Sequence, residues 1–157
     1  MSPHRQTFSA LVKKHGWTRG AELGVDKGLL FNRLLTDHPS LTLIGVDVCP
    51  VPHRLERCRE IETQYADRAT LLVMTTTAAA YKVADRSLDF VFIDADHTEE
   101  GAAADIAEWT SKVRPGGWVG GHDYNVKTFP GVVAAVDRAF GPRVMTYQPG
   151  HIWGVWC

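Results

Sequence analysis

The chain has 157 residues, of which 45% are hydrophobic and 22% charged, as expected for one globular domain over residues 1–157. Its formal charge is −1 with both signs interspersed, so we expect a small-molecule partner rather than nucleic acid or a membrane. Three cysteines without paired spacing exclude a disulfide framework, and no apolar run reaches the roughly 18 residues of a membrane span. We therefore expect a cytoplasmic protein.

Helical patterns alternate with short apolar runs along the whole chain. Residues 1–16 carry a helix that ends at Gly16, and the core follows over 20–157. LDFVFIDA is the strongest strand pattern, and the continuous apolar run LTLIGVDV is typical of a strand covered on both faces. In chain order, strands are predicted at 20–25, 41–48, 70–75, 88–95 and 118–124, and helices at 7–16, 27–37, 55–65, 76–83, 102–113 and 129–141.

The order of these elements predicts the fold class. Strands that alternate with helices of this length imply βαβ units and an α/β fold with a doubly wound, Rossmann-like, mostly parallel sheet. Two final strands flank a Gln148-Pro149-Gly150 turn and must be antiparallel to each other, because the turn is tight.

A glycine turn follows the first strand in ELGVDKG, at the sheet edge where open α/β folds bind ligands. Gly24 lets the backbone approach a ligand, and Gly28 allows close packing at the helix start. The spacing is not G-x-G-x-x-G, and Asp26 in the turn would repel a pyrophosphate. A cationic or zwitterionic nucleoside such as S-adenosylmethionine suits the turn better. The alternative is that both glycines only form a tight turn.

Asp47 ends the second strand, 23 positions after Gly24. A carboxylate about 20 residues past such a turn can accept hydrogen bonds from both ribose hydroxyls, so Asp47 favours a nucleoside ligand. The alternative is an exposed strand-end carboxylate. Cys49, just beyond, could form an apolar wall for adenine or belong to the turn.

Acidic and histidine side chains end the fourth and fifth strands. Asp94 and His97 follow one strand, and His122 and Asp123 follow the next, so neighbouring strands would bring them into one crevice. Asp94, His122 and Asp123 could hold Mg²⁺ or Mn²⁺, which would acidify a substrate hydroxyl. His97 is the candidate general base, because imidazole titrates near neutral pH.

Each of these residues also has a structural interpretation. Asp96 with Glu99 is typical of a helix N-cap and its box partner, which His97 would merely flank. His122 could hydrogen-bond a backbone carbonyl, and Asp123 could close a turn. The other histidines are assigned to the surface or turns, although His151 and Trp153 could border the substrate. These histidines are His4, His15, His38, His53 and His151.

Four segments, ELGVDKG, IGVDVCP, LDFVFIDADH and RPGGWVGGHDY, together resemble the class I S-adenosylmethionine-dependent methyltransferases. The combination of IDADH, Trp109, PGG and HDY is most similar to methyltransferase family 24, which is related to catechol-type and macrolide sugar O-methyltransferases. The likeness runs from about Gly20 to the C-terminus. It implies seven strands, with the last strand inserted antiparallel beside the fifth.

The resemblance also implies residue roles. Glu22 and Gly24 would face the methionine part of the cofactor and Asp47 its ribose, while Thr75 or Thr76 replaces an acidic adenine contact common in the family. His122 and Asp123 fall about where catechol-type enzymes hold a metal-binding Asp-Asn pair. The candidate cofactor-binding residues are Glu22, Gly24, Gly28, Asp47, Cys49, Thr75, Thr76 and Asp94; the catalytic ones are Asp94, His97 and His122.

We therefore predict a methyltransferase that methylates an oxygen of a small molecule or sugar. The chain lacks the N-terminal helical extension of many relatives, so its pocket is either open or completed by another subunit of a homo-oligomer. Two alternatives are a nonenzymatic or regulatory nucleoside-binding domain and an NAD-dependent dehydrogenase, against which the missing G-x-G-x-x-G argues.

Overall fold

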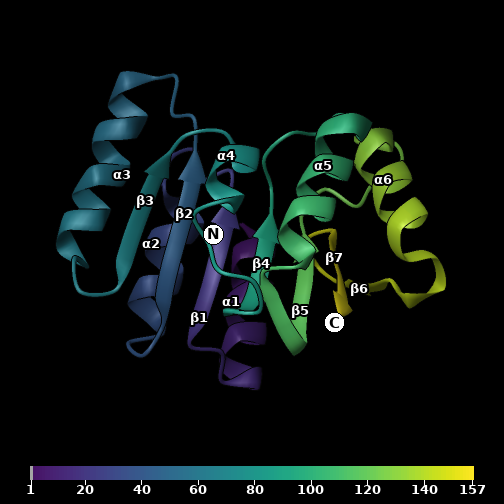
Figure 1. The fold of residues 1–157 in the computed structure, drawn as a ribbon, viewed down its shortest axis with the longest axis horizontal. Helices are drawn as coiled ribbons and strands as arrows, with labels where there is room; N and C mark the ends of the chain where they lie inside the picture. Colours follow the sequence, from purple (N-terminus) through teal and green to yellow (C-terminus); the bar gives the residue numbers. More distant parts are fainter. Residues whose placement is uncertain (1) are drawn as a thin grey trace.

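A seven-stranded sheet in the order β3-β2-β1-β4-β5-β7-β6 forms the centre of the computed structural model, which describes residues 2–157 (Figure 1). Strands β1 to β5 are parallel to one another, and β7 is antiparallel to both β5 and β6. The predicted α/β class, the seven strands and the insertion of the last strand beside the fifth are confirmed.

The helices and strands follow the predicted order. The strands are β1 (Arg19–Leu23), β2 (Thr42–Asp47), β3 (Ala69–Val73), β4 (Leu88–Ile93), β5 (Val113–Gly121), β6 (Met145–Tyr147) and β7 (Ile152–Trp156). The helices are α1 (Pro3–His15), α2 (Leu29–Asp37), α3 (Pro52–Gln64), α4 (Thr76–Ala80), α5 (Glu99–Thr110) and α6 (Pro130–Phe140), and a short 3₁₀ turn spans Gly141–Arg143. None of the helices formed by residues 2–157 is both long and apolar enough to cross a bilayer.

The boundary between α5 and β5 differs most from the prediction. The helix before the fifth strand was expected to reach Val113 and end at RPGG, but α5 ends at Thr110 and Val113 already pairs with Leu88 of β4. Val113 is buried, and a buried valine at this position fits the apolar face of a helix as well as it fits a strand. The register shifts just after this pair, and Trp118 pairs with Phe90.

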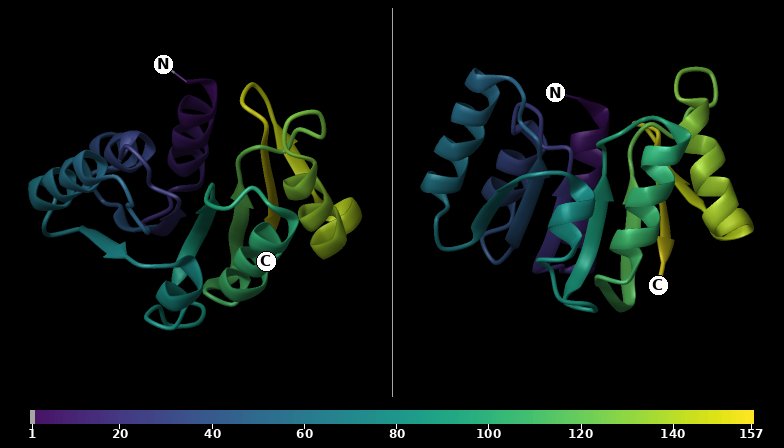
Figure 2. Two further views of the ribbon diagram at one scale, coloured as in Figure 1. Left: turned by 90° about the horizontal axis from the view of Figure 1, so that it is seen from above. Right: turned by 45° about the horizontal axis from the view of Figure 1, so that its top comes forward.

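The two faces of the sheet are covered by different helices (Figure 2). Helices α1, α2 and α3 pack on one face and α4, α5 and α6 on the other. Each face of the sheet has its own hydrophobic core, and the side chains of β4 alternate between the two. Phe90 and Phe92 pack on the side of α1, α2 and α3, whereas Val91 and Ile93 pack on the side of α4, α5 and α6. This two-sided burial explains the continuous apolar pattern of the central strands.

The N-terminal helix is held against the C-terminal hairpin. Gly16 ends α1 as predicted, with a left-handed φ of 63°. At its other end, the Thr7 hydroxyl donates to the Pro149 carbonyl at 2.8 Å. Gly150 packs so closely on this helix that a Cβ would lie 2.6 Å from the His4 Cα. The first turn of α1 is thereby fixed above the carboxyl ends of β4 and β5, beside His122.

Candidate functional site

A pocket of about 710 Å³ opens at the carboxyl edge of the sheet, where the strand order reverses between β1 and β4. This is the position at which doubly wound sheets bind ligands. It is lined by Gly24, Asp26, Val46, Asp47, Val48, Met74, Thr75, Thr76, Asp94, Ala95, Asp96 and His97. A second hollow of about 570 Å³, among residues such as Thr18 and Ser40 at the opposite edge, contains none of the predicted site residues.

The two glycines of the turn do different things. Gly24 has a φ of 86°, and a Cβ there would lie 2.0 Å from the backbone oxygen of Asp94, so only glycine lets β1 end this close to β4. Gly28 is the N-cap of α2, and a Cβ on it would lie 2.5 Å from the Ile61 side chain. Gly24 lines the pocket, whereas Gly28 packs the helix start against α3.

Glu22 lies in the middle of β1 and is 3% exposed. Its Oε2 has no hydrogen-bond partner within residues 2–157. Burial, together with the charges of Asp94 and Asp47, raises the pKa of Glu22 well above its ordinary value. Its unpartnered carboxyl oxygen is therefore available to a ligand donor that reaches β1.

Asp47 holds the loops on both sides of it. Its Oδ2 accepts the Asp26 backbone N–H at 2.8 Å, and its Oδ1 accepts the Cys49 backbone N–H at 2.6 Å. Each carboxylate oxygen keeps further acceptor capacity for a ligand in the pocket. Cys49 itself is buried and is not part of the pocket lining described above.

Two threonines line the pocket at the end of β3. The Thr75 hydroxyl accepts the Ala78 N–H at 3.2 Å and so caps α4. The Thr76 carbonyl accepts the indole N–H of Trp109 at 3.1 Å. Helix α5, which carries Trp109, therefore fixes the backbone of this part of the pocket.

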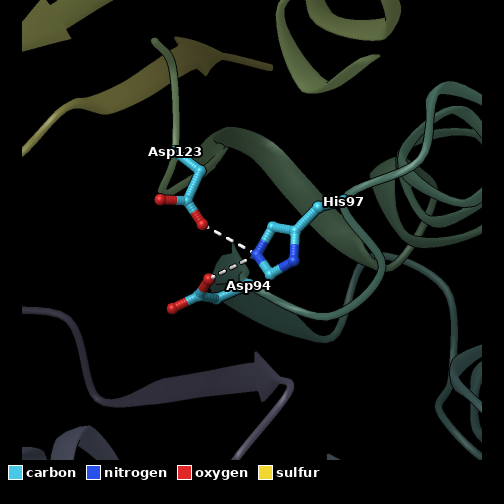
Figure 3. Close-up of side chains that lie close together, drawn as sticks. All are labelled: Asp94, His97 and Asp123. Carbon is cyan, nitrogen blue, oxygen red and sulfur yellow. Dashed lines mark hydrogen bonds and ion pairs between the residues drawn. The ribbon is translucent and has the colours of Figure 1, made fainter. Parts of the chain in front are cut away.

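The predicted carboxylate and imidazole side chains do converge (Figure 3). His97 Nε2 lies 2.7 Å from Asp123 Oδ2 and 3.5 Å from Asp94 Oδ1. His122 Nδ1 lies 2.9 Å from Asp123 Oδ1 and 3.7 Å from Asp94 Oδ1. Each carboxylate thus faces both imidazole rings.

These contacts shift the pKa values of the cluster. The hydrogen bond with Asp94 raises the pKa of His97, in opposition to burial. Burial lowers the pKa of His122, but its bonds to Asp123 and Asp94 outweigh this and raise it to about 9. Burial acts to raise the pKa of Asp94, but its interactions with the His122 and His97 rings outweigh burial and hold this pKa below its ordinary value. The two carboxylates therefore raise the pKa of both histidines.

Asp96 does not cap the next helix, so that interpretation is wrong. The N-cap of α5 is Thr98, whose hydroxyl accepts the Gly101 N–H at 3.0 Å. Asp96 accepts the Thr98 N–H at 2.8 Å instead, and it lines the pocket.

His4 is a site residue that the sequence did not reveal; its assignment to the surface is wrong. Its half-buried ring lies 4.1 Å from the His122 ring, measured between centroids. Burial, and then the charge of His122, lowers the pKa of His4 to about 4. Trp153, which the sequence offered as a residue that could border the substrate, is 1% exposed and lies in the core, where it lines a small hollow together with His97 and His122. No local pattern could have found His4, because its partner His122 is 118 positions away along the chain.

A divalent cation has suitable groups here. Ligand atoms of Asp94, His97 and Asp123 all lie within 4.8 Å of one another. Two of these residues were predicted as ligands; the third predicted one, His122, contacts both carboxylates. Two carboxylates with an imidazole match the preferences of Mg²⁺ or Mn²⁺.

Comparison with protein families identifies the class of the chain. The family 24 model, described as a methyltransferase domain, matches residues 21–124. Since this match covers most of the chain, the protein belongs to this family of methyltransferases, as its motifs predicted. No curated protein matches the sequence.

Solved structures share the fold at low sequence identity. An O-methyltransferase from Bacillus cereus in complex with SAH has 19% identity and a TM-score of 0.71, over 100% of this chain and 82% of that one. PaMTH1 from Podospora anserina, also bound to SAH, has 15% identity and a TM-score of 0.72 over 98% and 78%. CalS11, a TDP-rhamnose 3′-O-methyltransferase of calicheamicin biosynthesis, has 14% identity and a TM-score of 0.75 over 98% and 78%.

Proposed function

We propose that this protein uses S-adenosylmethionine to methylate an oxygen of a small molecule or sugar. The observation that carries the proposal is the acid-lined pocket at the strand switch point, whose lining includes Asp94 and His97. These two residues contact His122 and Asp123 just outside the lining. Two structural relatives bind SAH and one methylates a sugar nucleotide, which supports the same cofactor and acceptor class.

The residues of the pocket match the chemistry of this cofactor. Asp47 would accept the ribose hydroxyls while it keeps its two backbone N–H donors. The unpartnered Glu22 oxygen and Asp94 would face the cationic methionine part. Thr75 and Thr76 would border the adenine. When bound, the cofactor supplies a methyl group on a sulfonium, ready for in-line attack.

His97 would receive the proton of the acceptor hydroxyl. As the acceptor oxygen bonds to the methyl carbon, the carbon–sulfur bond breaks and S-adenosylhomocysteine is left. Asp123 holds the ring through Nε2, so Nδ1 is the nitrogen that points away from both carboxylates (Figure 3). Because the pKa of His97 is raised, we expect the rate to rise with pH as the ring loses its proton.

A divalent cation is the finer part of the proposal. Asp94 and Asp123, with His122 as the sequence predicted, would hold Mg²⁺ or Mn²⁺ beside the acceptor, and His97 would remain free to act as the base. The cation would neutralise the two carboxylates and favour the ionised hydroxyl. Activity that survives a chelator and the Asp94→Ala substitution would remove the cation from the proposal.

The test of the proposed activity is transfer of an isotope-labelled methyl group from S-adenosylmethionine to a panel of sugars, sugar nucleotides, catechols and other phenols. We expect label in an ether product together with equimolar S-adenosylhomocysteine. If the protein binds the cofactor but no member of the panel is labelled, the acceptor class is wrong. If the cofactor does not bind, the proposal as a whole fails.

A further inference from the structure

Arg5 is a half-buried cation that the proposed chemistry does not use. It lies in the first turn of α1, directly after His4, whose ring contacts that of His122 above the ends of β4 and β5 (Figure 2). Among residues 2–157, the Arg5 guanidinium forms no hydrogen bond and no ion pair. A guanidinium is always charged and carries only donors, and partial burial removes part of the water that would solvate it. An anionic ligand would therefore satisfy Arg5.

The spacing of buried residues places Arg5 on the side of α1 that faces the sheet. Phe8 and Ser9, three and four positions further along, are both buried, and residues at this spacing share one helix face. The Phe8 ring lies 4.3 Å from that of Phe92 in β4, measured between centroids. Because helical side chains lean toward the N-terminus, Arg5 projects from the preceding turn toward the carboxyl edge of the sheet.

Arg5 approaches the site without joining the cofactor pocket. Phe92 pairs in register with Glu22 of β1, so both side chains lie on the face that α1 covers. Burial is the main cause that raises the pKa of Glu22, and the charge of Arg5 opposes it, which agrees with this placement. Of the described residues that line the cofactor pocket, none belongs to α1. Arg5 therefore borders the site from outside that pocket, where an acceptor would approach.

The two carboxylates beside His97 and His122 are already matched by these imidazoles. Asp94 and Asp123 each face both rings, and within the described part of the chain neither carboxylate forms an ion pair with the guanidinium. Arg5 thus adds a positive charge that an anionic group on the acceptor would neutralise. A guanidinium pairs with a carboxylate or phosphate through two parallel hydrogen bonds, so it also orients the group that it binds.

We propose that Arg5 is a specificity-determining residue that binds an anionic group of the acceptor, a carboxylate or a phosphate. The inference rests on the proposed function, because it assigns the space between α1 and the two carboxylates to the acceptor. It narrows the acceptor class to hydroxyl compounds that also carry a negative charge. The methionine carboxylate of the cofactor has the same chemistry, so the experiments distinguish these two sources.

The first test measures, by calorimetry, how matched acceptors bind to the protein in complex with S-adenosylhomocysteine. Protocatechuate and catechol differ by a carboxylate, and glucose 1-phosphate and glucose differ by a phosphate. We expect the native protein to bind the anionic member of at least one pair about tenfold more tightly, or better. Arg5→Gln should reduce this ratio to near one, and Arg5→Lys, which keeps the charge, should retain part of it.

A control variant and a second ligand separate the acceptor from the cofactor. Lys14→Gln removes an exposed cation from the last turn of the same helix and should leave the ratio unchanged. Arg5→Gln should bind S-adenosylhomocysteine as tightly as the native protein does. A loss of this affinity that methylthioadenosine, which lacks the amino-acid part, does not share would assign Arg5 to the cofactor carboxylate instead. Thermal unfolding of each variant checks that it is folded.

The outcomes distinguish the inference from the proposed function. If the native protein binds S-adenosylhomocysteine but prefers neither anionic acceptor, or if folded Arg5→Gln keeps the preference, the role of Arg5 is overturned and the cofactor assignment stays intact. Assignment of Arg5 to the cofactor carboxylate would overturn the inference in the same way. Absence of S-adenosylhomocysteine binding by the native protein would overturn the proposed function, and the inference with it.

Discussion

The two halves of the site are built in different ways. The half formed by the ends of β1, β2 and β3 is local: the glycine turn and Asp47 are close in sequence and are joined by backbone hydrogen bonds. The half formed by β4 and β5 draws its side chains from distant segments, including His4 of α1. The first half offers carboxylates to a cation, whereas in the second half imidazoles compensate the carboxylates.

This difference explains what each half can tolerate. In the first half, the fold supplies the geometry through glycine conformation and backbone donors, so a side-chain change there alters ligand binding. In the second half, the charges hold one another in place, so removal of one leaves its partners unbalanced. The predictions below test this contrast, beginning with the largest expected effect.

Replacement of the proposed base should cause the largest loss. His97→Gln keeps a polar side chain but removes the proton acceptor, so kcat/KM should fall by about 10² to 10⁴. Steady-state kinetics with an acceptor from the panel measures this fall. The affinity for S-adenosylhomocysteine should change little, and a rate within a few-fold of the native value would exclude His97 as the base.

The charge balance of the second half predicts a pH-dependent stability. The pKa of His122 is raised to about 9, so its stabilisation is complete below the unfolded value near 6.5 and is lost as the pH rises to about 9. The shift corresponds to about 3 kcal/mol. Urea unfolding at a series of pH values, with chelator present, should show this loss in the native protein.

The matched variant for this measurement is His122→Gln, which should lower the stability near pH 6.5 and flatten its dependence on pH. A native protein whose unfolding free energy is the same at pH 6.5 and pH 9 would contradict the pairing of His122 with Asp123 and Asp94.

Asp123 should raise the pKa of the proposed base His97 rather than accept the proton itself. Its charge is among the causes that raise the pKa of His97, so Asp123→Asn should move the rising limb of the pH–rate profile to lower pH. The profile is measured from kcat/KM over a pH series. An unshifted limb in an active variant would show that the titrating group is not His97.

The smallest effect concerns the joint between α1 and the C-terminal hairpin. Gly150 has a φ of 122°, and an added Cβ would lie 2.6 Å from His4, so Gly150→Ala should destabilise the fold by about 1 to 3 kcal/mol. Gly116→Ala is the control: its φ is also positive, at 76°, but the nearest atom is 3.9 Å away. Equal effects of both changes in urea unfolding would contradict close packing on His4.

The sequence predicts the half of the site at the ends of β1, β2 and β3 more fully than the half at the ends of β4 and β5. Hydrophobic runs and glycines predicted the strands, the glycine turn and the position of Asp47, because these signals arise from neighbouring residues. Convergence at the ends of β4 and β5 was also predicted, since carboxyl ends of adjacent parallel strands meet. The insertion of β7 beside β5 came from the family resemblance.

The features that escaped prediction depend on distant packing. His4 reaches His122 only because the hairpin fixes the first turn of α1. Asp105 lies inside α5, where the sequence alone gives no sign that an acid is buried, yet it is 2% exposed in the packed fold. The misplaced start of β5 has a similar cause, because Val113 fits the buried face of a helix and that of a strand equally well.

The central claim is that the acidic pocket between β1, β2 and β4 binds the S-adenosyl cofactor. Calorimetric titration with S-adenosylhomocysteine tests it most directly, with native protein, Asp47→Ala and the exposed control Asp67→Ala. We expect the native protein and the control to bind alike, and Asp47→Ala to bind roughly 100-fold more weakly, because two charge-assisted hydrogen bonds to the ribose are lost. No heat of binding with the native protein, or equal affinity in all three, would contradict the claim.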